Sequence, residues 1–407
     1  LDGTLFLEIQ DDLQRADSSS VGFNVRTLLS DNQAEDSDRL EEAGVSEDAV
    51  VLAETLLRTS TRPLLIVGAG VMESTFTTLS EWGVRERIPT LFSWGAQSLG
   101  DPQEPLHQGL FGNHSPGRGN ELLREADLLI CIGVGLLQHQ VGKDRSLFGP
   151  KASIIYVNSD FAECSRVSHD FSPRAESFVS NAQSFACSAH SRIRFPNAHY
   201  WPDVEWHSLA DLTEEERPPH SHEAVSVLTE VLKYCPSDAV VFSDAGATLS
   251  WTYQAANLVK SPPIYTAYNL HGMGYALPAA VGASVAGIST VLSVNGDGGL
   301  MMNLQEFALA RSGNVKTLVL DNQGYGIIRQ TQDDYLDGDH SGSSPHHPNS
   351  PLPEYDVTAL SSAFGIPSRR IKPNELVDNL TWFFASACPR TLVVDIDLSL
   401  KVLGVGL

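Results

Sequence analysis

Cysteine and basic side chains are scarce in this sequence of 407 residues. Its five cysteines are scattered and include no CxxC pair, so we expect neither a disulfide framework nor a zinc cluster, and a reducing, cytoplasmic compartment. The 27 Lys and Arg residues face 50 acidic ones, for a net charge of −23, which argues against nucleic-acid binding and against docking on anionic lipid. No apolar run reaches the roughly 18 residues that a membrane span needs.

The overall composition is that of a globular protein, with 42% hydrophobic and 19% charged residues. The length predicts two or three domains. Residues 1–9 alternate like a β-strand, but no initiator Met precedes them, and the following segment is polar and acidic. We therefore expect residues 1–14 to be a remnant of an N-terminal domain and residues 15–45 to be an acidic linker.

Buried-strand patterns alternate with helical patterns in two further regions. The first region, residues 46–190, contains four such apolar runs, at 63–67, 89–92, 127–132 and 153–157. A second, Pro-containing linker is expected at 191–221. The region 222–407 contains four more runs, at 239–243, 290–294, 316–320 and 391–395. The sequence therefore predicts an α/β protein with two doubly wound parallel-sheet domains.

The strongest chemical signal lies between residues 296 and 326. Gly296-Asp297-Gly298-Gly299 follows a predicted strand, and the next strand ends in Asp321-Asn322-Gln323-Gly324-Tyr325-Gly326. The 25 residues from Asp297 to Asn322 correspond to one strand–helix–strand step, which places both side chains at the carboxyl edge of one sheet. Asp297, Asn322 and the Gly324 carbonyl can supply oxygen ligands to Mg²⁺. The alternative is two unrelated glycine turns.

This spacing resembles the metal- and diphosphate-binding motif of thiamine-diphosphate enzymes of the acetolactate synthase type. The likeness implies central and diphosphate-binding domains of that family. A second block supports it, because Asp244-Ala245-Gly246-Ala247-Thr248 and His271-Gly272-Met273 are similar to family segments that contact the diphosphate and place an apolar residue under the bent cofactor. The implied cofactor-binding residues are Gly246, Ala247, Thr248, His271, Gly272, Met273, Gly296, Gly298, Gly299, Asn322, Gly324, Tyr325 and Gly326.

The resemblance implies decarboxylation of a pyruvate-like 2-oxo acid, followed by carboligation to an acceptor carbonyl, in a homodimer or homotetramer. In the family, a glutamate of the pyrimidine-binding domain activates the cofactor. No residue of this sequence matches it, so no catalytic residue is assigned. The alternative is a non-catalytic, truncated homologue or a subunit that needs a separate pyrimidine-binding chain. FAD stays open as a further cofactor, because the arginines of FAD-binding members are not found after the 127–132 run.

Four further expectations concern product choice, a mobile loop, a surface and an alternative cofactor. Simple pyruvate decarboxylases of the family carry a glutamate where Ile328 stands, so an apolar residue there favours carboligation over release of an aldehyde. The polar stretch 337–353 is interpreted as a mobile loop and a candidate lid. Arg369 and Arg370 are interpreted as part of a solvated face. An NAD-dependent oxidoreductase would require a third glycine after Gly68-Ala69-Gly70, and the sequence has none at that position.

Overall fold

The computed structural model describes residues 47–112, 115, 117–195, 200–211, 223–267, 270–385 and 387–402. The chain divides into two compact units, Leu1–Gly44 and Val45–Leu407, and every described residue belongs to the second. The predicted N-terminal remnant and the acidic linker lie outside the described residues. Among the described helices, none combines the length and apolarity that crossing a bilayer requires.

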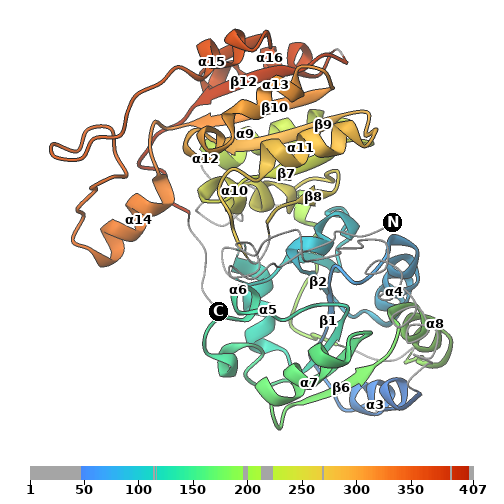
Figure 1. Ribbon diagram of the computed structural model, residues 1–407. Coiled ribbons are helices and arrows are strands. Elements are labelled where there is room, and N and C mark those ends of the chain that lie inside the picture. The colour runs from blue at the N-terminus through green and yellow to red at the C-terminus, as the bar shows by residue number, and fades with distance from the viewer. Residues whose placement is uncertain are drawn as a thin grey trace, which may run out of the picture. The chain divides into compact units, whose positions relative to one another are not determined.

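Six parallel strands form a central sheet, in the order β3-β2-β1-β4-β5-β6 (Figure 1). Their bounds are β1 (Pro63–Val67), β2 (Thr90–Phe92), β3 (His107–Leu110), β4 (Leu128–Ile132), β5 (Ser153–Asn158) and β6 (Ala175–Val179). The helices of this part are α3 (Glu47–Leu57), α4 (Glu73–Glu86), η2 (Trp94–Leu99), α5 (Gly117–Glu125), α6 (Gln138–Val141), η3 (Arg145–Leu147), α7 (Phe161–Asp170), α8 (Ala182–Arg192) and η4 (Leu209–Asp211). Strands β1 and β4 are buried along their whole length, as expected for parallel strands covered on both faces.

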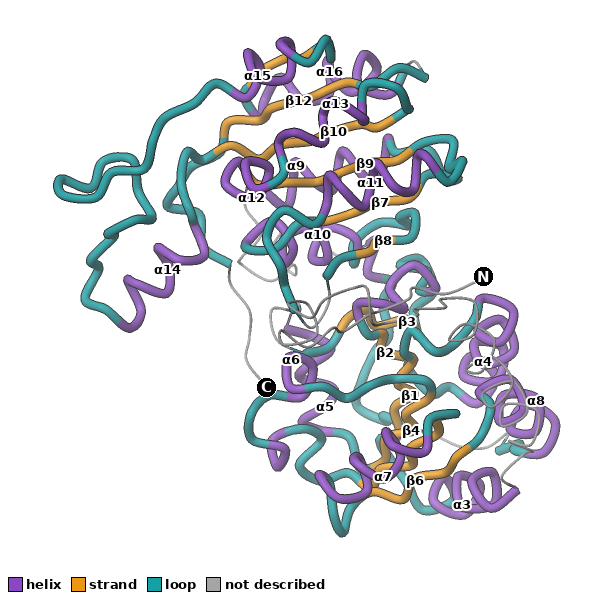
Figure 2. The backbone as a smooth tube through the Cα atoms, viewed as in Figure 1, coloured by secondary structure: helices purple, strands orange, loops and turns teal. Residues whose placement is uncertain are grey.

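The C-terminal sheet is also built of six parallel strands, in the order β11-β12-β10-β9-β7-β8 (Figure 2). The strands are β7 (Val240–Ser243), β8 (Ile264–Tyr265), β9 (Val291–Gly296), β10 (Val315–Asp321), β11 (Ser368–Ile371) and β12 (Arg390–Asp395). The helices are α9 (Glu223–Tyr234), α10 (Ala247–Ala256), α11 (Ala276–Val285), α12 (Asp297–Met302), η5 (Leu304–Glu306), α13 (Phe307–Ala310), α14 (Gly326–Tyr335), α15 (Val357–Ala363), η6 (Pro373–Glu375) and α16 (Leu376–Phe384).

The two sheets confirm the predicted α/β class and the eight predicted strands, with ends that differ by at most two residues. Four strands had not been predicted: β3, β6, β8 and β11. Strand β8 has two residues, and β11 (Ser-Arg-Arg-Ile) is mostly polar, so neither shows an apolar run. Part of the predicted second linker packs on the central sheet, because buried Trp201 donates from its indole to the Pro63 carbonyl at 2.8 Å.

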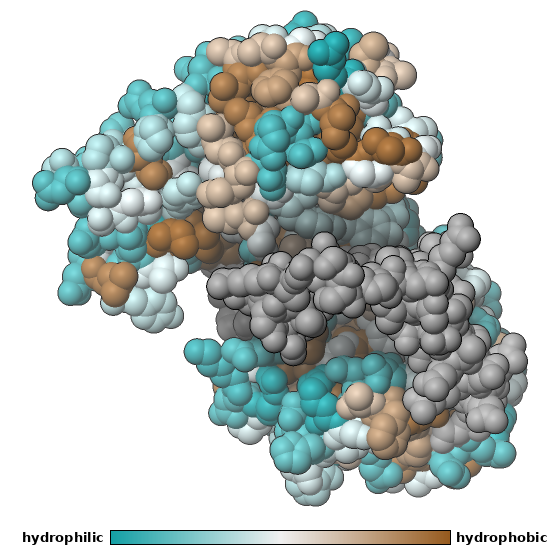
Figure 3. All heavy atoms as spheres, in the orientation of Figure 1, coloured by the Kyte–Doolittle hydropathy of each residue, from teal (hydrophilic) through white to brown (hydrophobic). Residues whose placement is uncertain are grey.

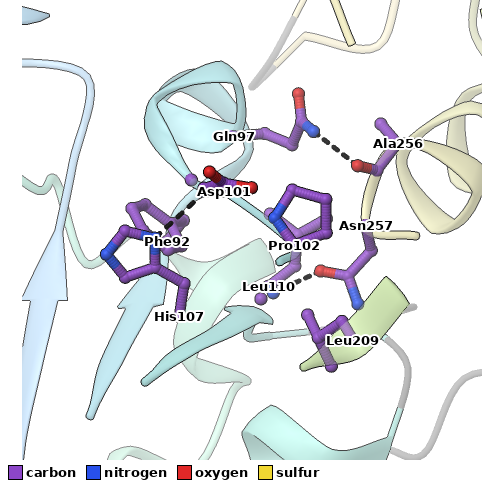
Figure 4. A pocket seen from close by; sticks show the side chains of 11 residues that line it. Phe92, Gln97, Asp101, Pro102, His107, Leu110, Leu209, Ala256 and Asn257 are labelled. Carbon is purple, nitrogen blue, oxygen red and sulfur yellow. Dashed lines mark hydrogen bonds between the residues drawn. The ribbon is translucent and has the colours of Figure 1, made fainter. Parts of the chain in front are cut away.

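Short contacts join η2 and the end of β3 in the central part to α10 and the residue after it. Gln97 donates to the Ala256 carbonyl at 2.7 Å, and the Leu110 amide donates to the Asn257 side chain at 2.9 Å (Figure 4). They surround a cavity of about 20 Å³, room for about one water molecule. Trp94 at the start of η2 stacks on Tyr253 of α10, with ring centroids 5.0 Å apart. These contacts hold Trp94 against the C-terminal part.

Each sheet has a switch point, the place where strands before and after it along the chain are added on opposite sides. Switch points are the usual ligand sites of open α/β sheets. In the central sheet this point lies between β1 and β4, and in the C-terminal sheet between β7 and β9. The first is filled by backbone: a methyl group at Gly68 would lie 2.2 Å from the Gly133 carbonyl oxygen. The glycines after β1 are therefore explained by close packing of two loops.

Candidate functional site

The point between β7 and β9 opens into a cavity of about 460 Å³. The segments that follow β7, β9 and β10 line it, together with residues of α10, α12 and α14. The predicted site residues found on its wall are Gly246, Ala247, Thr248, His271, Met273, Gly296, Asp297, Gly298, Gly299, Asn322, Gly324, Tyr325 and Gly326. Gly272 is not among the lining residues; it is exposed, and a methyl group there would have no atom within 4 Å.

Asp297 is a buried carboxylate at the start of α12, directly after β9, with 3% of its surface exposed. Burial, and then the charge of Asp321, raise the pKa of Asp297 to about 7, although backbone amides of Gly298 and Asn322 oppose the shift. The Tyr355 hydroxyl donates to its Oδ2 atom at 3.3 Å. A divalent cation would offset the cost of burying this charge, so the residue fits a metal ligand.

Asn322 and Gly324 lie on a tight turn after β10. The Asn322 side-chain oxygen accepts a hydrogen bond from the Gly324 amide at 3.1 Å, and Gln323 between them has φ of 56°. Leu320 pairs with Gly296 in the sheet, which brings this turn beside Asp297. Among the described residues, no group of three or more His, Cys, Asp or Glu side chains could hold a metal ion. A metal at this edge would therefore use amide and carbonyl oxygens beside one carboxylate, a donor set suited to Mg²⁺.

Helix starts and glycines form the part of the cavity that would receive a diphosphate. Gly246, with φ of 88°, precedes the ten-residue helix α10, whose first residues Ala247 and Thr248 line the cavity. Free N–H groups at a helix start favour anions. A methyl group at Gly298 would lie 2.2 Å from the Tyr325 ring, and one at Gly299 would lie 2.5 Å from the Asp244 carboxylate. These glycines let α12 pack closely under the neighbouring turns.

The segment 270–275 is fixed by Asp244, which is buried after β7. Asp244 accepts hydrogen bonds from the Gly274 amide at 2.9 Å and from the Ala245 amide at 2.7 Å. His271 has φ of 45°, and its ring meets Trp94 edge to face at 6.1 Å. Burial lowers the pKa of His271. Met273 lines the cavity with 43% of its surface exposed, so an apolar side chain is available to a ligand.

Sequence comparison with domain families agrees with this geometry. Residues 51–181 match the central domain of thiamine pyrophosphate enzymes, and residues 244–396 match their C-terminal thiamine-pyrophosphate-binding domain. Together the two matches cover more than half of the chain. The chain belongs to the thiamine-diphosphate-dependent enzyme family.

Relatives within this family include acetolactate synthases. The large subunits of isozymes 1 and 2 from Escherichia coli (strain K12) are both 29% identical, over 81% and 85% of this chain. The chain spans 57% and 62% of those subunits. Among solved structures, benzoylformate decarboxylase from Polynucleobacter necessarius superposes with a TM-score of 0.67 at 21% identity, covering 88% of this chain and 66% of that one. This likeness shows the same fold.

The structure also places residues in the cavity wall, or in contact with it, that sequence reasoning missed. Trp94 comes from η2 of the central part, and Trp251 from α10. Tyr355 reaches Asp297 from 58 positions further along the chain. Ile328, noted in the sequence for its effect on product choice, does line the cavity. No local motif marks Trp94 or Tyr355, because both contacts depend on the folded arrangement of distant segments.

Proposed function

We propose that the cavity between β7 and β9 binds thiamine diphosphate and Mg²⁺, and that this chain acts in decarboxylation of a pyruvate-like 2-oxo acid with carboligation to an acceptor carbonyl. The observation that supports this most is the meeting of buried Asp297 with Asn322 and Gly324 at the wall of one cavity. When bound, thiamine diphosphate supplies an electron sink for breaking the bond beside a ketone. The chain's own residues would hold it in place.

Each group of residues has a distinct task in this proposal. Asp297, Asn322 and the Gly324 carbonyl would hold the metal, and the start of α10 with Gly296, Gly298 and Gly299 would receive the diphosphate. Met273 would support the rest of the cofactor. Trp94 and Trp251, both nearly buried, would keep water from the site. Ile328 offers no proton to the product, which favours carboligation over aldehyde release.

A partner surface is the second part of the proposal. Leu270 is 85% exposed, and Ile328 on the cavity wall is 48% exposed. Apolar side chains also gather over the face of the C-terminal part that carries α11 and α13 (Figure 3), where Val285 and Leu309 are 81% and 60% exposed. Exposed apolar patches of this kind mark interaction sites. We infer that a pyrimidine-binding domain, with its activating glutamate, completes the cavity within a homodimer or homotetramer, or from a separate chain.

Calorimetric titration of thiamine diphosphate into the protein with Mg²⁺ present tests the binding part. Asp297→Ala should weaken binding at least about 100-fold, because a buried metal ligand is removed. Asp378→Ala, at an exposed position of α16, is the control and should bind as the unchanged protein does. Equal affinities for all three proteins would reject the site. Pyruvate consumption, measured next, separates an enzyme from a protein that binds the cofactor without turnover.

A further inference from the structure

Tyr355 stands out as the side chain that donates to the proposed metal ligand. Its hydroxyl lies 3.3 Å from Asp297 Oδ2. Tyr355 belongs to neither glycine motif. It lies near the end of the segment 337–356, just before α15. Side chains that hydrogen-bond a metal ligand orient it and tune its affinity.

Tyr355 packs against a hydrophobic cluster of the C-terminal part that includes Phe307 and Val357. Directly after it, Asp356 caps α15 by accepting from the Thr358 and Ala359 amides at 2.8 and 3.2 Å. This packing and the adjacent helix cap support Tyr355 in the position from which its hydroxyl reaches Asp297.

The Tyr355 hydroxyl is directed at Asp297, whose Oδ2 atom accepts a hydrogen bond from it. A neutral hydroxyl next to a carboxylate acts as a donor. The oxygens of Asp321 accept from other donors, from Arg370 at 2.6 Å and from the Gln323 amide at 3.0 Å.

The segment that carries Tyr355 is also tied to the metal turn. The Tyr325 amide donates to the Ser343 carbonyl at 3.1 Å, and Gln332 of α14 donates to the Ser341 carbonyl at 2.9 Å. In Figures 1 and 2 this segment runs outward from α14 and returns to α15. It therefore contacts both halves of the proposed metal site, through Tyr325 and through Asp297.

We propose that Tyr355 is a positioning residue for the metal site, orienting the Asp297 carboxylate toward a divalent cation through its hydroxyl. This inference rests on the proposed function, since it requires a metal at Asp297. Tyr355→Phe removes the hydroxyl and keeps the ring that packs on the core. The matched control is Tyr335→Phe on α14, where the side chain is 81% exposed.

The test is a Mn²⁺ titration with excess thiamine diphosphate, followed by electron paramagnetic resonance of the free ion, with the melting temperature of the metal-free protein measured alongside. Tyr355→Phe should raise the Kd for Mn²⁺ about 10-fold and leave the metal-free melting temperature unchanged, and Tyr335→Phe should change neither. An unchanged Kd, or a raised Kd accompanied by a lower metal-free melting temperature, overturns the positioning role. If the unchanged protein binds Mn²⁺ but Tyr355→Phe has no effect, the inference alone fails. If the unchanged protein does not bind Mn²⁺, the proposed function fails with it.

Discussion

The two sheets are both doubly wound, but the switch point of one is filled by backbone and that of the other is an open cavity. Between β1 and β4, the Gly70 amide donates to the Gly133 carbonyl at 2.9 Å, and a methyl group at Gly68 would collide with that carbonyl. Between β7 and β9, the corresponding point opens into a cavity of about 460 Å³. Backbone packing thus closes one ligand position, whereas the other is open. Two copies of one topology need not both bind a ligand.

Two carboxylates, one in each part, differ in the direction of their pKa shift. Asp127, just before β4, accepts from the Thr61 amide at 2.7 Å, the Arg62 amide at 3.0 Å and the Ser60 hydroxyl. Burial alone would raise the pKa of Asp127, but these donors outweigh it and lower the pKa. Asp297 is buried more deeply, and there burial and the charge of Asp321 outweigh the hydrogen-bond donors and raise the pKa to about 7. Donors thus set the pKa of the half-buried carboxylate in the central part, and burial sets that of the carboxylate beside the cavity.

The largest effect is expected from filling the closed switch point. Gly68→Ala places a methyl group 2.2 Å from backbone, which cannot be relieved by a rotamer change, so the free energy of unfolding should fall by about 3 kcal/mol or more. Chemical denaturation measures this. Gly272→Ala is the control, because nothing lies within 4 Å of the added group, and it should leave stability unchanged. A similar loss for both variants would contradict the contrast.

Removing the Asp127 carboxylate should give the next largest loss of stability. Asp127→Ala leaves the Thr61 and Arg62 amides without this acceptor, which should cost about 2 kcal/mol in unfolding free energy. Because the folded pKa of Asp127 is lowered, its contribution is present above the unfolded pKa of about 4 and is lost as the pH falls through the folded value. The difference in unfolding free energy between the unchanged protein and Asp127→Asn should therefore become smaller in acid. A difference that stays constant with pH would count against this account.

Asp297→Asn should act in the opposite direction in the ligand-free protein. The raised pKa of Asp297 means that the folded state holds a proton more readily than the unfolded state between about pH 4 and pH 7. Stability of the unchanged protein should fall as pH rises through that window. Above it, Asp297→Asn should be more stable by about 2 kcal/mol. With Mg²⁺ and thiamine diphosphate the order should reverse, and the absence of a reversal in thermal melts would contradict a ligand role.

The smallest effect is expected at Met273. Met273→Ala removes apolar contact with the cofactor, so the Kd for thiamine diphosphate should rise about fivefold, or roughly 1 kcal/mol. Stability should not change, since 43% of the side chain is exposed. Met72→Ala in the central part, where the side chain is 68% exposed, is the matched control for calorimetry. An unchanged Kd for Met273→Ala would remove that residue from the site.

Sequence reasoning reached the parts of the site that are local. The glycine motifs after β9 and β10 were predictable because each follows an apolar strand, and neighbouring parallel strands end at the same edge. Strand β11 was not predictable, since Arg369 and Arg370 occupy its middle. Arg370 was interpreted as part of a solvated face, yet its guanidinium also pairs with buried Asp321 at 2.6 Å. Trp94 and Tyr355 could not be assigned, because their contacts join segments far apart in sequence.

The most direct test of the open switch point is an anomalous-difference map from crystals grown with Mn²⁺ and thiamine diphosphate. The account predicts a single strong peak about 2.1 Å from an Asp297 carboxylate oxygen, with Asn322 and the Gly324 carbonyl as its other protein ligands. Diphosphate density should lie at the start of α10. A map with no peak there, or with the metal and diphosphate in the central sheet between β1 and β4, would contradict it.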